Sequence, residues 1–259
     1  TALRGERLGL VLDVDQTLVH TVPCSAFASP LDAADFVDAR GEPELFWWCH
    51  AGDTARACYV KLRPGVRCFL RSLLPFYELS IFSMGDTSYL DFVLAKLDPL
   101  RTFFADGAVA SRKDVLRETQ SKHIGRVCRH PDQRTVIFDD CYDVWKHDID
   151  RSRGQLAFVR AFAYTFLDKC QEVLASRRGR GAVPRDGDTH LHHAGCLFRA
   201  LHAEVVGPKK LSTKAALHEV WQRTLQGIRV FIIDGACDRG LMKAAEAFGA
   251  RVEQGLHKG

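Results

Sequence analysis

The segment Leu8–Thr21, which reads LGLVLDVDQTLVHT, constrains the fold and chemistry of this chain more than any other. An apolar run typical of a buried strand ends there in two carboxylates, Asp13 and Asp15, and Thr17 follows two residues later. At the carboxyl end of a parallel strand, alternate residues project the same way, so both carboxylates can face one pocket. Two carboxylates so close together repel each other unless a cation neutralises them, which indicates magnesium held by oxygen ligands. One carboxylate can then attack phosphorus while the other handles the leaving group's proton, so the segment predicts phosphoryl transfer.

A short DxD motif also has a simpler interpretation. Asp is favoured where a strand passes into a turn, because its side chain hydrogen-bonds the local backbone, and Asp13 alone would fit that description. Three later segments favour the catalytic interpretation.

Two of these segments each read as a strand followed by a helix. Tyr59–Leu74 places Pro64 at the first helical position, whereas Tyr77–Leu97 ends its strand at Ser83 and can cap its helix with Asp86. The first helix has the apolar face Val66, Phe69, Leu70, Leu73 and Leu74, and the second has Leu90, Val93, Leu94 and Leu97. A hydroxyl at the end of a strand, beside a glycine and helix amides, is well placed to bind phosphate oxygens. Ser83 is therefore a candidate phosphate ligand.

The third segment, Ser121–Trp145, supplies a cation and further carboxylates. Lys122 precedes an apolar strand, Thr135–Phe138, which ends in Asp139 and Asp140. The lysine can neutralise a phosphate group, and the carboxylates can complete a metal site.

Together these strings resemble the TFIIF-associating RNA polymerase II C-terminal-domain phosphatases, a branch of the haloacid-dehalogenase superfamily with a DxDxT motif. The family pattern runs LDLDxTLVH, KLRPG, YEL-x-[IV]-[FY]-T-x-G-x-x-x-Y, LDP, SR, SK-x-G and DD-x-x-DVW. This chain has LDVDQTLVH, KLRPG, YELSIFSMGDTSY, LDP, SR, SKHIG and FDDCYDVW in the same order, between about Leu8 and Trp145. So many ordered strings at compatible spacing are hard to obtain by chance.

The resemblance implies a role for each matching residue. Asp13 would be the nucleophile that forms an aspartyl-phosphate, and Asp15 the general acid and then base, with its backbone carbonyl on Mg²⁺. The other implied roles are Thr17, Ser83 and Lys122 on the phosphoryl group, Asp140 on the metal, Asp139 in support of the lysine or a metal-bound water, and Arg63 at the substrate rim. The resemblance also implies a nuclear phosphoserine phosphatase whose partners are the phosphorylated C-terminal domain of RNA polymerase II and general transcription factors.

Three residues depart from the family pattern. Ser83 stands where threonine is usual, which keeps the hydroxyl but loses a methyl that stiffens the rotamer. Cys141 replaces the arginine that commonly follows the second aspartate, so one cation near the site is missing. Gln16 replaces a frequent glutamate, and we attach no function to it.

The segment Thr21–Cys58 is too long for a simple connection and predicts a small β-lobe above the active site. In the resembling family this region is a lid that grips an extended substrate, and Trp47 and Trp48 would suit a proline-containing peptide at its rim. Alternatively, the two indoles only pack the lobe, as large aromatic side chains usually do. Because strand residues alternate, one indole can point inward and the other outward.

Composition agrees with this interpretation. With 259 residues and 46% hydrophobic content, the chain can bury one sizeable core and a smaller second one. The apolar stretch Leu156–Leu167 is interrupted by Arg160, so we expect no membrane span. No secretory signal stands at the start, and the missing initiator methionine suggests a fragment. Nine cysteines without CxxC pairs predict reduced thiols in an intracellular protein, and a net charge of +4 permits an anionic phosphopeptide without requiring nucleic acid.

The segment Ser176–Asp188 loses its apolar positions and predicts a linker, although its arginines would also suit RNA or an acidic peptide. After it, the string HLHHAGC favours the start of a helix with Leu191, Leu197 and Leu201 over a zinc site, because no second ligand pair stands at zinc-finger spacing. The zinc interpretation fails in the same way for Cys24, Cys49, His50 and Cys58.

The tail, Leu211–Gly259, predicts a helix at Ala215–Leu225, a buried strand at Arg229–Ile233 and a second helix ended by Gly249. The strings LQGIRVFIIDG and AAEAFGARV resemble the first half of a BRCT domain, which follows the catalytic domain in the resembling phosphatases. The later BRCT strands are absent, so we expect a truncated copy.

We therefore predict an α/β chain with a haloacid-dehalogenase Rossmann-like parallel sheet, an inserted β-lobe lid and a partial BRCT-like C-terminal region. The predicted boundaries are 1–175 for the phosphatase domain, with the lid at 21–58, then 176–210 for linker and helix and 211–259 for the tail. The predicted function is magnesium-dependent dephosphorylation of serine in the RNA polymerase II heptad repeats. The alternatives are the same core acting on another nuclear phosphoprotein, a non-catalytic phosphopeptide-binding scaffold, and a nucleic-acid 3′-phosphatase. The intact carboxylates argue against the scaffold, and the lack of a P-loop partner or a continuous basic stripe argues against the last.

Overall fold

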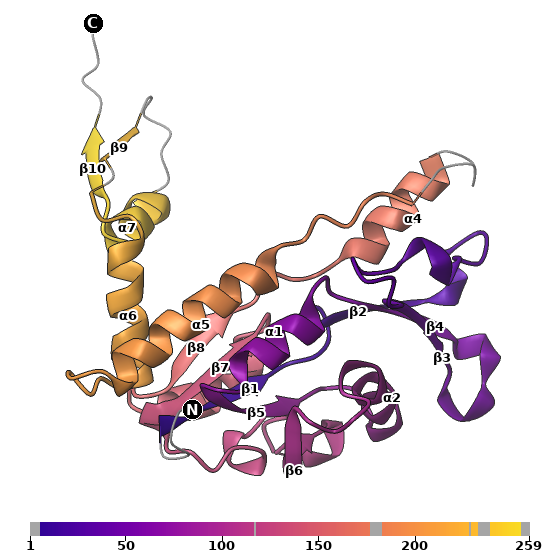
Figure 1. Cartoon of the computed structure of the whole chain (residues 1–259), viewed down its shortest axis with the longest axis horizontal. Helices are drawn as coiled ribbons and strands as arrows, with labels where there is room; N and C mark the ends of the chain where they lie inside the picture. The colour runs from indigo at the N-terminus through magenta and orange to yellow at the C-terminus, as the bar shows by residue number, and fades with distance from the viewer. Residues whose placement is uncertain (1–5, 117, 177–182, 228, 233–238, 255–259) are drawn as a thin grey trace, which may run out of the picture.

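A five-stranded parallel sheet forms the centre of the molecule in the computed structural model, which describes residues 6–116, 118–176, 183–227, 229–232 and 239–254 (Figure 1). The strand order is β6-β5-β1-β7-β8. The strands are β1 (Leu8–Leu12), β5 (Tyr77–Phe82), β6 (Phe104–Ala110), β7 (Thr135–Asp139) and β8 (Ala157–Arg160). Because β1 lies in the middle and pairs with β5 and β7, the residues that follow these three strands meet at one edge of the sheet. The predicted α/β class with a parallel sheet is confirmed.

Both faces of the central sheet are buried, which explains the continuous apolar run of β1. Leu8, Leu10 and Leu12 belong to a core shared with α1 (Val66–Leu73), α2 (Thr87–Leu97) and α5 (His190–Val206). The opposite face packs Val11 against Trp145 and the region of α3 (Lys146–Arg151). The sheet thus lies between helices on one side and mostly irregular segments on the other.

The first helix begins later than the sequence predicts. Pro64 and Gly65 form a turn in which the Val66 N–H donates to the Arg63 carbonyl at 3.1 Å, and Gly65 has φ +73°. This left-handed conformation suits glycine, so α1 starts at Val66 and Pro64 is not its first residue. The other predicted cap is confirmed, because the Asp86 side chain accepts from the Tyr89 N–H at the start of α2.

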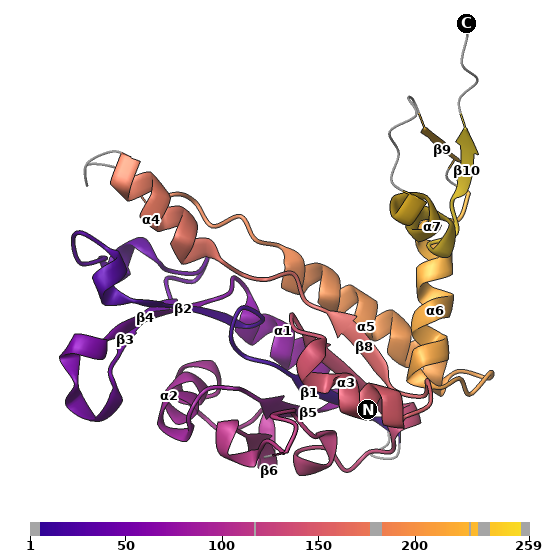
Figure 2. The ribbon, with the colours of Figure 1, turned by 180° about the vertical axis from the view of Figure 1, so that it is seen from behind.

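The predicted β-lobe is a three-stranded antiparallel sheet in the order β2-β4-β3 (Figure 2). Its strands are β2 (Val19–Pro23), β3 (Leu45–Trp48) and β4 (Cys58–Leu62). Register pairs Trp47 with Tyr59, whose side chain packs in a small core with Leu45 and Phe166. Trp48 lies on the other face, where it contacts the Tyr89 ring with centroids 5.3 Å apart. The expected alternation of the two indoles is therefore observed.

The segment predicted as a linker is ordered where the structure describes it. After α4 (Phe166–Ser176), residues 177–182 lie outside the described residues, but Asp186 and Asp188 form ion pairs with buried Lys61 and Arg63. Residues 183–188 have no regular secondary structure, as a linker would, but two of their carboxylates bind buried cations in distant segments. The helix predicted after it is present as α5, and its Leu191, Phe198 and Leu201 are buried in the main core.

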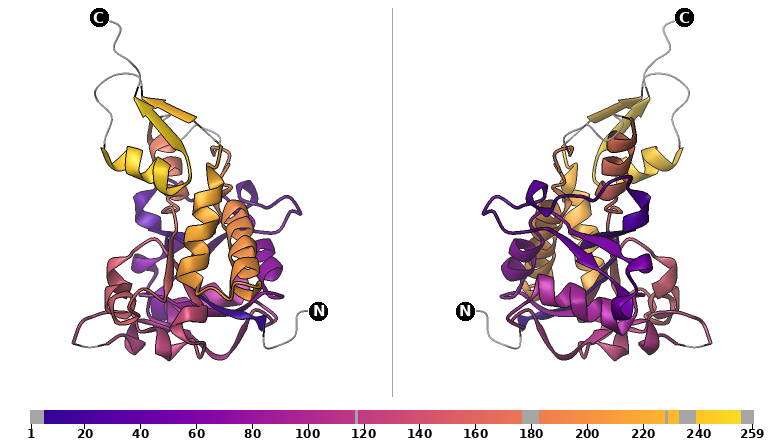
Figure 3. Two further views of the ribbon diagram at one scale, coloured as in Figure 1. Left: turned by 90° about the vertical axis from the view of Figure 1, so that its left-hand side faces the viewer. Right: turned by 90° about the vertical axis from the view of Figure 1, so that its right-hand side faces the viewer.

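The tail extends from the body at the end of α6 (Thr213–Thr224) (Figure 3). It contains β9 (Arg229–Ile232), α7 (Arg239–Ala247) and β10 (Arg251–Gln254), and the two strands are parallel. Ile233, the last residue of the predicted strand, lies outside the described residues. The strand and helices agree with the predicted order, and the likeness to a BRCT domain stays a prediction. None of the described helices is both long and apolar enough to cross a bilayer.

Candidate active site

The carboxyl edge of the sheet brings a buried lysine onto two aspartates. Lys122 Nζ lies 2.5 Å from Asp13 Oδ1, just after β1, and 2.7 Å from Asp139 Oδ2, at the end of β7. All three side chains are buried. Residues separated by more than a hundred positions thus form one charged cluster, as the predicted parallel sheet requires.

The cluster carries more negative than positive charge. The pKa of Asp13 is raised to about 7, mainly by burial and in part by the nearby Asp139, although Lys122 acts in the opposite direction. Burial alone would lower the pKa of Lys122, but the two carboxylates raise it above its usual value, so the ammonium stays charged. One ammonium cannot neutralise the several carboxylates at this edge.

This excess charge and the donor set fit a divalent metal ion. Carboxylate oxygens of Asp13, Asp139 and Asp140 lie within 4.8 Å of one another. Oxygen-only donors are those that Mg²⁺ prefers. Asp140 is partly accessible. Its pKa is raised, mainly by partial burial and next by the negative charge of the neighbouring Asp139. The residues present therefore fit the predicted magnesium.

Asp15 is held by two hydroxyl groups. Ser83 Oγ donates to one carboxylate oxygen at 3.2 Å, and Tyr89 OH donates to the other at 2.5 Å. Tyr89 in turn lies 2.6 Å from Thr21 Oγ1 in the lid. Burial raises the pKa of Asp15, while the bonds from Tyr89 and Ser83 oppose that rise. A carboxyl group with a raised pKa and a fixed orientation can donate and accept a proton.

Two residues without a role predicted from the sequence, Tyr89 and Trp145, contact the site carboxylates. Trp145 Nε1 donates to Asp139 Oδ2 at 2.7 Å, and the Cys141 N–H donates to Asp139 Oδ1 at 2.7 Å. Both residues stand in strings that match the family pattern: Tyr89 is the last residue of YELSIFSMGDTSY, and Trp145 is the last residue of FDDCYDVW. That match could have identified them as site residues. Both residues fix the carboxylates that the motifs supply.

A cation from a neighbouring strand lies near the position where Cys141 replaces arginine. Arg160, the last residue of β8, donates from Nε to the Asp140 carbonyl at 3.2 Å. The Cys141 side chain itself is exposed. A positive charge from β8 thus lies beside the backbone of the second aspartate.

Thr17 has a buried hydroxyl without a partner among the described residues. Its side chain is fully buried, and Oγ1 makes no hydrogen bond. A buried hydroxyl without a partner costs free energy, so this atom indicates a polar ligand at the site. Ser83 is equally buried, and its Oγ also accepts from the Gly85 N–H at 2.9 Å.

Arg63 does not lie at a substrate rim. Only 1% of its surface is exposed, and its guanidinium contacts Asp188 and the carbonyls of Thr17 and Phe162. The expectation that Arg63 lies at the substrate rim is therefore wrong, because the side chain is buried and Asp188 compensates its charge inside the protein. Of the two tryptophans, Trp48 shares a face with Tyr89, whereas Trp47, at 51% exposure, lies on the other face of the lid sheet.

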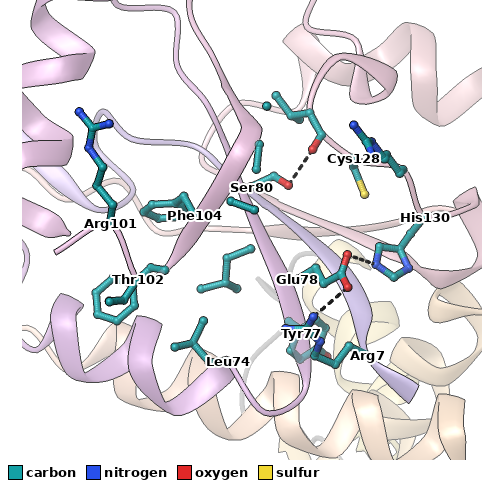
Figure 4. A pocket seen from close by; sticks show the side chains of 17 residues that line it. Arg7, Leu74, Tyr77, Glu78, Ser80, Arg101, Thr102, Phe104, Cys128 and His130 are labelled. Atoms are coloured by element: carbon teal, nitrogen blue, oxygen red, sulfur yellow. Dashed lines mark hydrogen bonds and ion pairs between the residues drawn. The ribbon is translucent and has the colours of Figure 1, made fainter. Parts of the chain in front are cut away.

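A separate pocket opens near the amino end of β5 (Figure 4). It measures about 460 Å³, and Glu78 there binds Arg7 at 3.0 Å and His130 at 2.9 Å. Its lining residues include none of the predicted site residues. The candidate active site is thus the charged cluster at the opposite edge of the sheet.

Metal-free protein is expected to lose stability as the pH rises from about 4 towards 7. Asp13 has an ordinary pKa of 3.8, and burial raises it to about 7 in the folded protein. Between these values the folded state holds a proton that the unfolded state has released, so raising the pH favours unfolding. Mg²⁺ competes with that proton, so its stabilising effect on Tm should be larger at about pH 7.5 than at about pH 5. Thermal unfolding with and without Mg²⁺ measures this, and an equal shift at both values would contradict it.

Comparison with known proteins gives one family match and several relatives. The model of the NLI interacting factor-like phosphatase family matches residues 8–154, more than half of the chain. An RNA polymerase II C-terminal domain phosphatase of Encephalitozoon cuniculi is 24% identical, and the match covers 95% of this chain and 69% of the relative. The corresponding phosphatases of Schizosaccharomyces pombe and Homo sapiens are 32% and 28% identical over 55% of this chain. The chain spans only 20% and 14% of their lengths.

A solved structure has the same fold. The structure of Fcp1, described as an essential RNA polymerase II CTD phosphatase, is 21% identical, with a TM-score of 0.63 over 98% of this chain and 82% of that chain. The similarity covers the charged edge, the lid and the C-terminal helices in one alignment. The resemblance inferred from the ordered motifs is confirmed.

Proposed function

Because this chain belongs to the NLI interacting factor-like phosphatase family, we propose that it is a magnesium-dependent protein serine phosphatase acting on the heptad repeats of RNA polymerase II. The observation that carries the chemistry is the cluster in which Lys122 pairs with Asp13 and Asp139. The substrate is suggested by the names of the relatives, which are RNA polymerase II C-terminal domain phosphatases. A nuclear location and contact with general transcription factors would follow from that substrate.

In the first half of the proposed reaction, Asp13 attacks the phosphorus of phosphoserine. The bond between phosphorus and the serine oxygen breaks, and Asp15 gives its proton to that oxygen as the serine leaves. Lys122 and the hydroxyls of Thr17 and Ser83 would bind the phosphoryl oxygens, since this transition state needs positioning and positive charge. The product is an aspartyl-phosphate on Asp13.

In the second half, water attacks the same phosphorus. Asp15 takes the proton of that water, the bond to Asp13 breaks, and inorganic phosphate leaves. Asp13, Asp140 and the backbone carbonyl of Asp15 would hold Mg²⁺, with Asp139 supporting Lys122 and the metal site. Bound magnesium would neutralise negative charge on the carboxylates and the phosphoryl group.

The proposed substrate is tested with singly phosphorylated heptad peptides, compared with unrelated phosphoserine peptides and a small aryl phosphate, each with and without Mg²⁺. We expect a higher kcat/KM for the heptad peptides. Equal rates on all phosphoserine peptides would remove the polymerase assignment and favour another nuclear phosphoprotein. Binding without turnover would favour a phosphopeptide scaffold.

In the lid, Trp48 is the residue that we expect to contact a peptide substrate. Its ring packs edge-on against Tyr89, which holds Asp15, and it remains partly accessible. Trp48→Ala is expected to lower kcat/KM for the phosphopeptide by roughly 10-fold or more and for aryl phosphate by less, because only the peptide reaches the indole.

Trp47→Ala is the matched control, since this exposed indole lies on the opposite face of the same strand. It should leave both substrates close to the wild-type rate. Equal losses on both substrates in the Trp48 variant would mean that this indole only packs against Tyr89. A selective peptide loss in the Trp47 variant would move the substrate to the other face.

A further inference from the structure

Two cationic side chains of the KLRPG string are buried, and carboxylates from a distant part of the chain compensate their charge. Lys61 and Arg63 are each 1% exposed. Asp186 and Asp188, 125 residues away from their partners, bind them from residues 183–188, which we call the strap. Lys61 also binds Glu44 at 2.8 Å. The other described partners of Arg63 are uncharged: two backbone carbonyls and the Tyr164 ring, whose centroid lies 5.2 Å from the guanidinium.

The Arg63 guanidinium connects the strap to the segment after β1 that carries Asp13, Asp15 and Thr17. Nε and Nη2 each donate to Asp188 at 2.9 Å, which is a bidentate pair. On its other side, Nη1 donates to the Thr17 carbonyl at 3.0 Å and to the Phe162 carbonyl at 3.0 Å. The side chain of Asp188 is therefore one bridging residue away from the backbone of Thr17.

We infer that Asp188 is a positioning residue for catalysis, which fixes Thr17 through Arg63. This inference rests on the proposed function, in which Thr17 binds the phosphoryl group. It extends the catalytic unit beyond residues 8–154, the part that the family model matches, because the strap and α5 follow that part.

The position of Thr17 depends on this bridge because its hydroxyl has no partner among the described residues. Its hydrogen bonds among the described residues are those of its backbone: the N–H donates to the Val14 carbonyl at 3.3 Å, and the carbonyl accepts from Arg63 at 3.0 Å. Asp188 is itself held at the start of α5, where the His190 N–H donates to it at 3.0 Å. Burial alone would raise the pKa of Asp188, but the paired Arg63 outweighs this and holds that pKa below its usual value. The carboxylate therefore stays ionised.

Removing the charge of Asp188 would leave a buried guanidinium without a counterion. Such a group attracts water or moves, because an uncompensated buried charge is strongly unfavourable. Its bonds to the Thr17 and Phe162 carbonyls would then lengthen or break. A shift of a phosphate ligand by about 1 Å can reduce turnover by about 100-fold.

The test uses the full chain and compares Asp188→Asn with Asp186→Asn. Asp186 lies in the same strap and binds Lys61, Tyr164 and, through Oδ1, the Asp188 N–H at 3.2 Å, an acceptor that asparagine keeps. The structure records no direct contact between Asp186 and Arg63. We expect both variants to lower Tm. Asp188→Asn should reduce kcat/KM for aryl phosphate by about 10- to 100-fold and weaken inhibition by orthovanadate, a phosphate analogue. Asp186→Asn should keep both values within about 3-fold of wild type. Asp188→Glu, which keeps the charge, should recover most of the loss.

A second variant keeps the inference testable if Asp188→Asn does not fold. The pair Arg63→Met with Asp188→Asn removes both buried charges, so it should fold, yet it also removes the bond to the Thr17 carbonyl and should stay slow. Wild-type kinetics in this pair, or equal orthovanadate inhibition in the Asp186 and Asp188 variants, would overturn the inference alone. A wild-type chain without phosphatase activity would overturn the proposed function and the inference with it.

Discussion

Asp13→Asn is expected to reduce hydrolysis of a small aryl phosphate by about 10⁴-fold or more, because the amide keeps the shape but lacks the attacking charge. The variant should fold, since Lys122 keeps its bond to Asp139 at 2.7 Å. It also removes a carboxylate whose pKa is raised to about 7 by burial and, to a smaller extent, by neighbouring carboxylates. Steady-state kinetics on purified protein, with thermal unfolding to confirm the fold, measures the effect.

Asp143→Asn is the matched control for this substitution. Asp143 follows the metal-binding segment, but its side chain is exposed and no described ion pair involves it. Its variant should keep the wild-type rate. If the Asp13 variant also kept that rate after removal of contaminating phosphatases, covalent catalysis by Asp13 would be wrong.

Removal of divalent cations is expected to lower activity to background, and Mg²⁺ should restore it. The carboxylates of Asp13, Asp139 and Asp140 crowd within 4.8 Å, and Lys122 supplies one positive charge to this group. A phosphate group would add more negative charge, so turnover needs a further cation. Chelation followed by titration with Mg²⁺ or Zn²⁺ measures the dependence.

Asp140→Asn provides a readout that does not depend on turnover. This variant removes a proposed metal ligand but leaves the Lys122 pairs with Asp13 and Asp139 in place. It should therefore lose the rise in Tm that Mg²⁺ gives the wild-type protein. Full activity in excess chelator, or activity supported by zinc alone, would refute the magnesium assignment.

The sequence by itself determined three of the five strands of the central sheet, β1, β5 and β7, and the residues at their carboxyl ends. Continuous apolar runs identify strands that are buried on both faces; Asp13 directly follows β1, and β7 ends in Asp139. Since parallel strands bring their carboxyl ends to one edge, Asp13, Ser83 and Asp139 had to lie near one another. These inferences depend on neighbours in the chain and on one general rule of sheet geometry.

Only the tertiary structure decided which partners hold those residues. Asp188 lies 125 residues from Arg63, and neither the spacing nor the composition of the strap indicates that it turns back to a buried arginine. The face on which Trp48 lies depends on the register of β3 against β4, since a shift by one residue would exchange it with Trp47. Local patterns follow from contacts along the chain, whereas ion pairs, register and burial depend on how distant segments pack, so these features became visible only in the folded molecule.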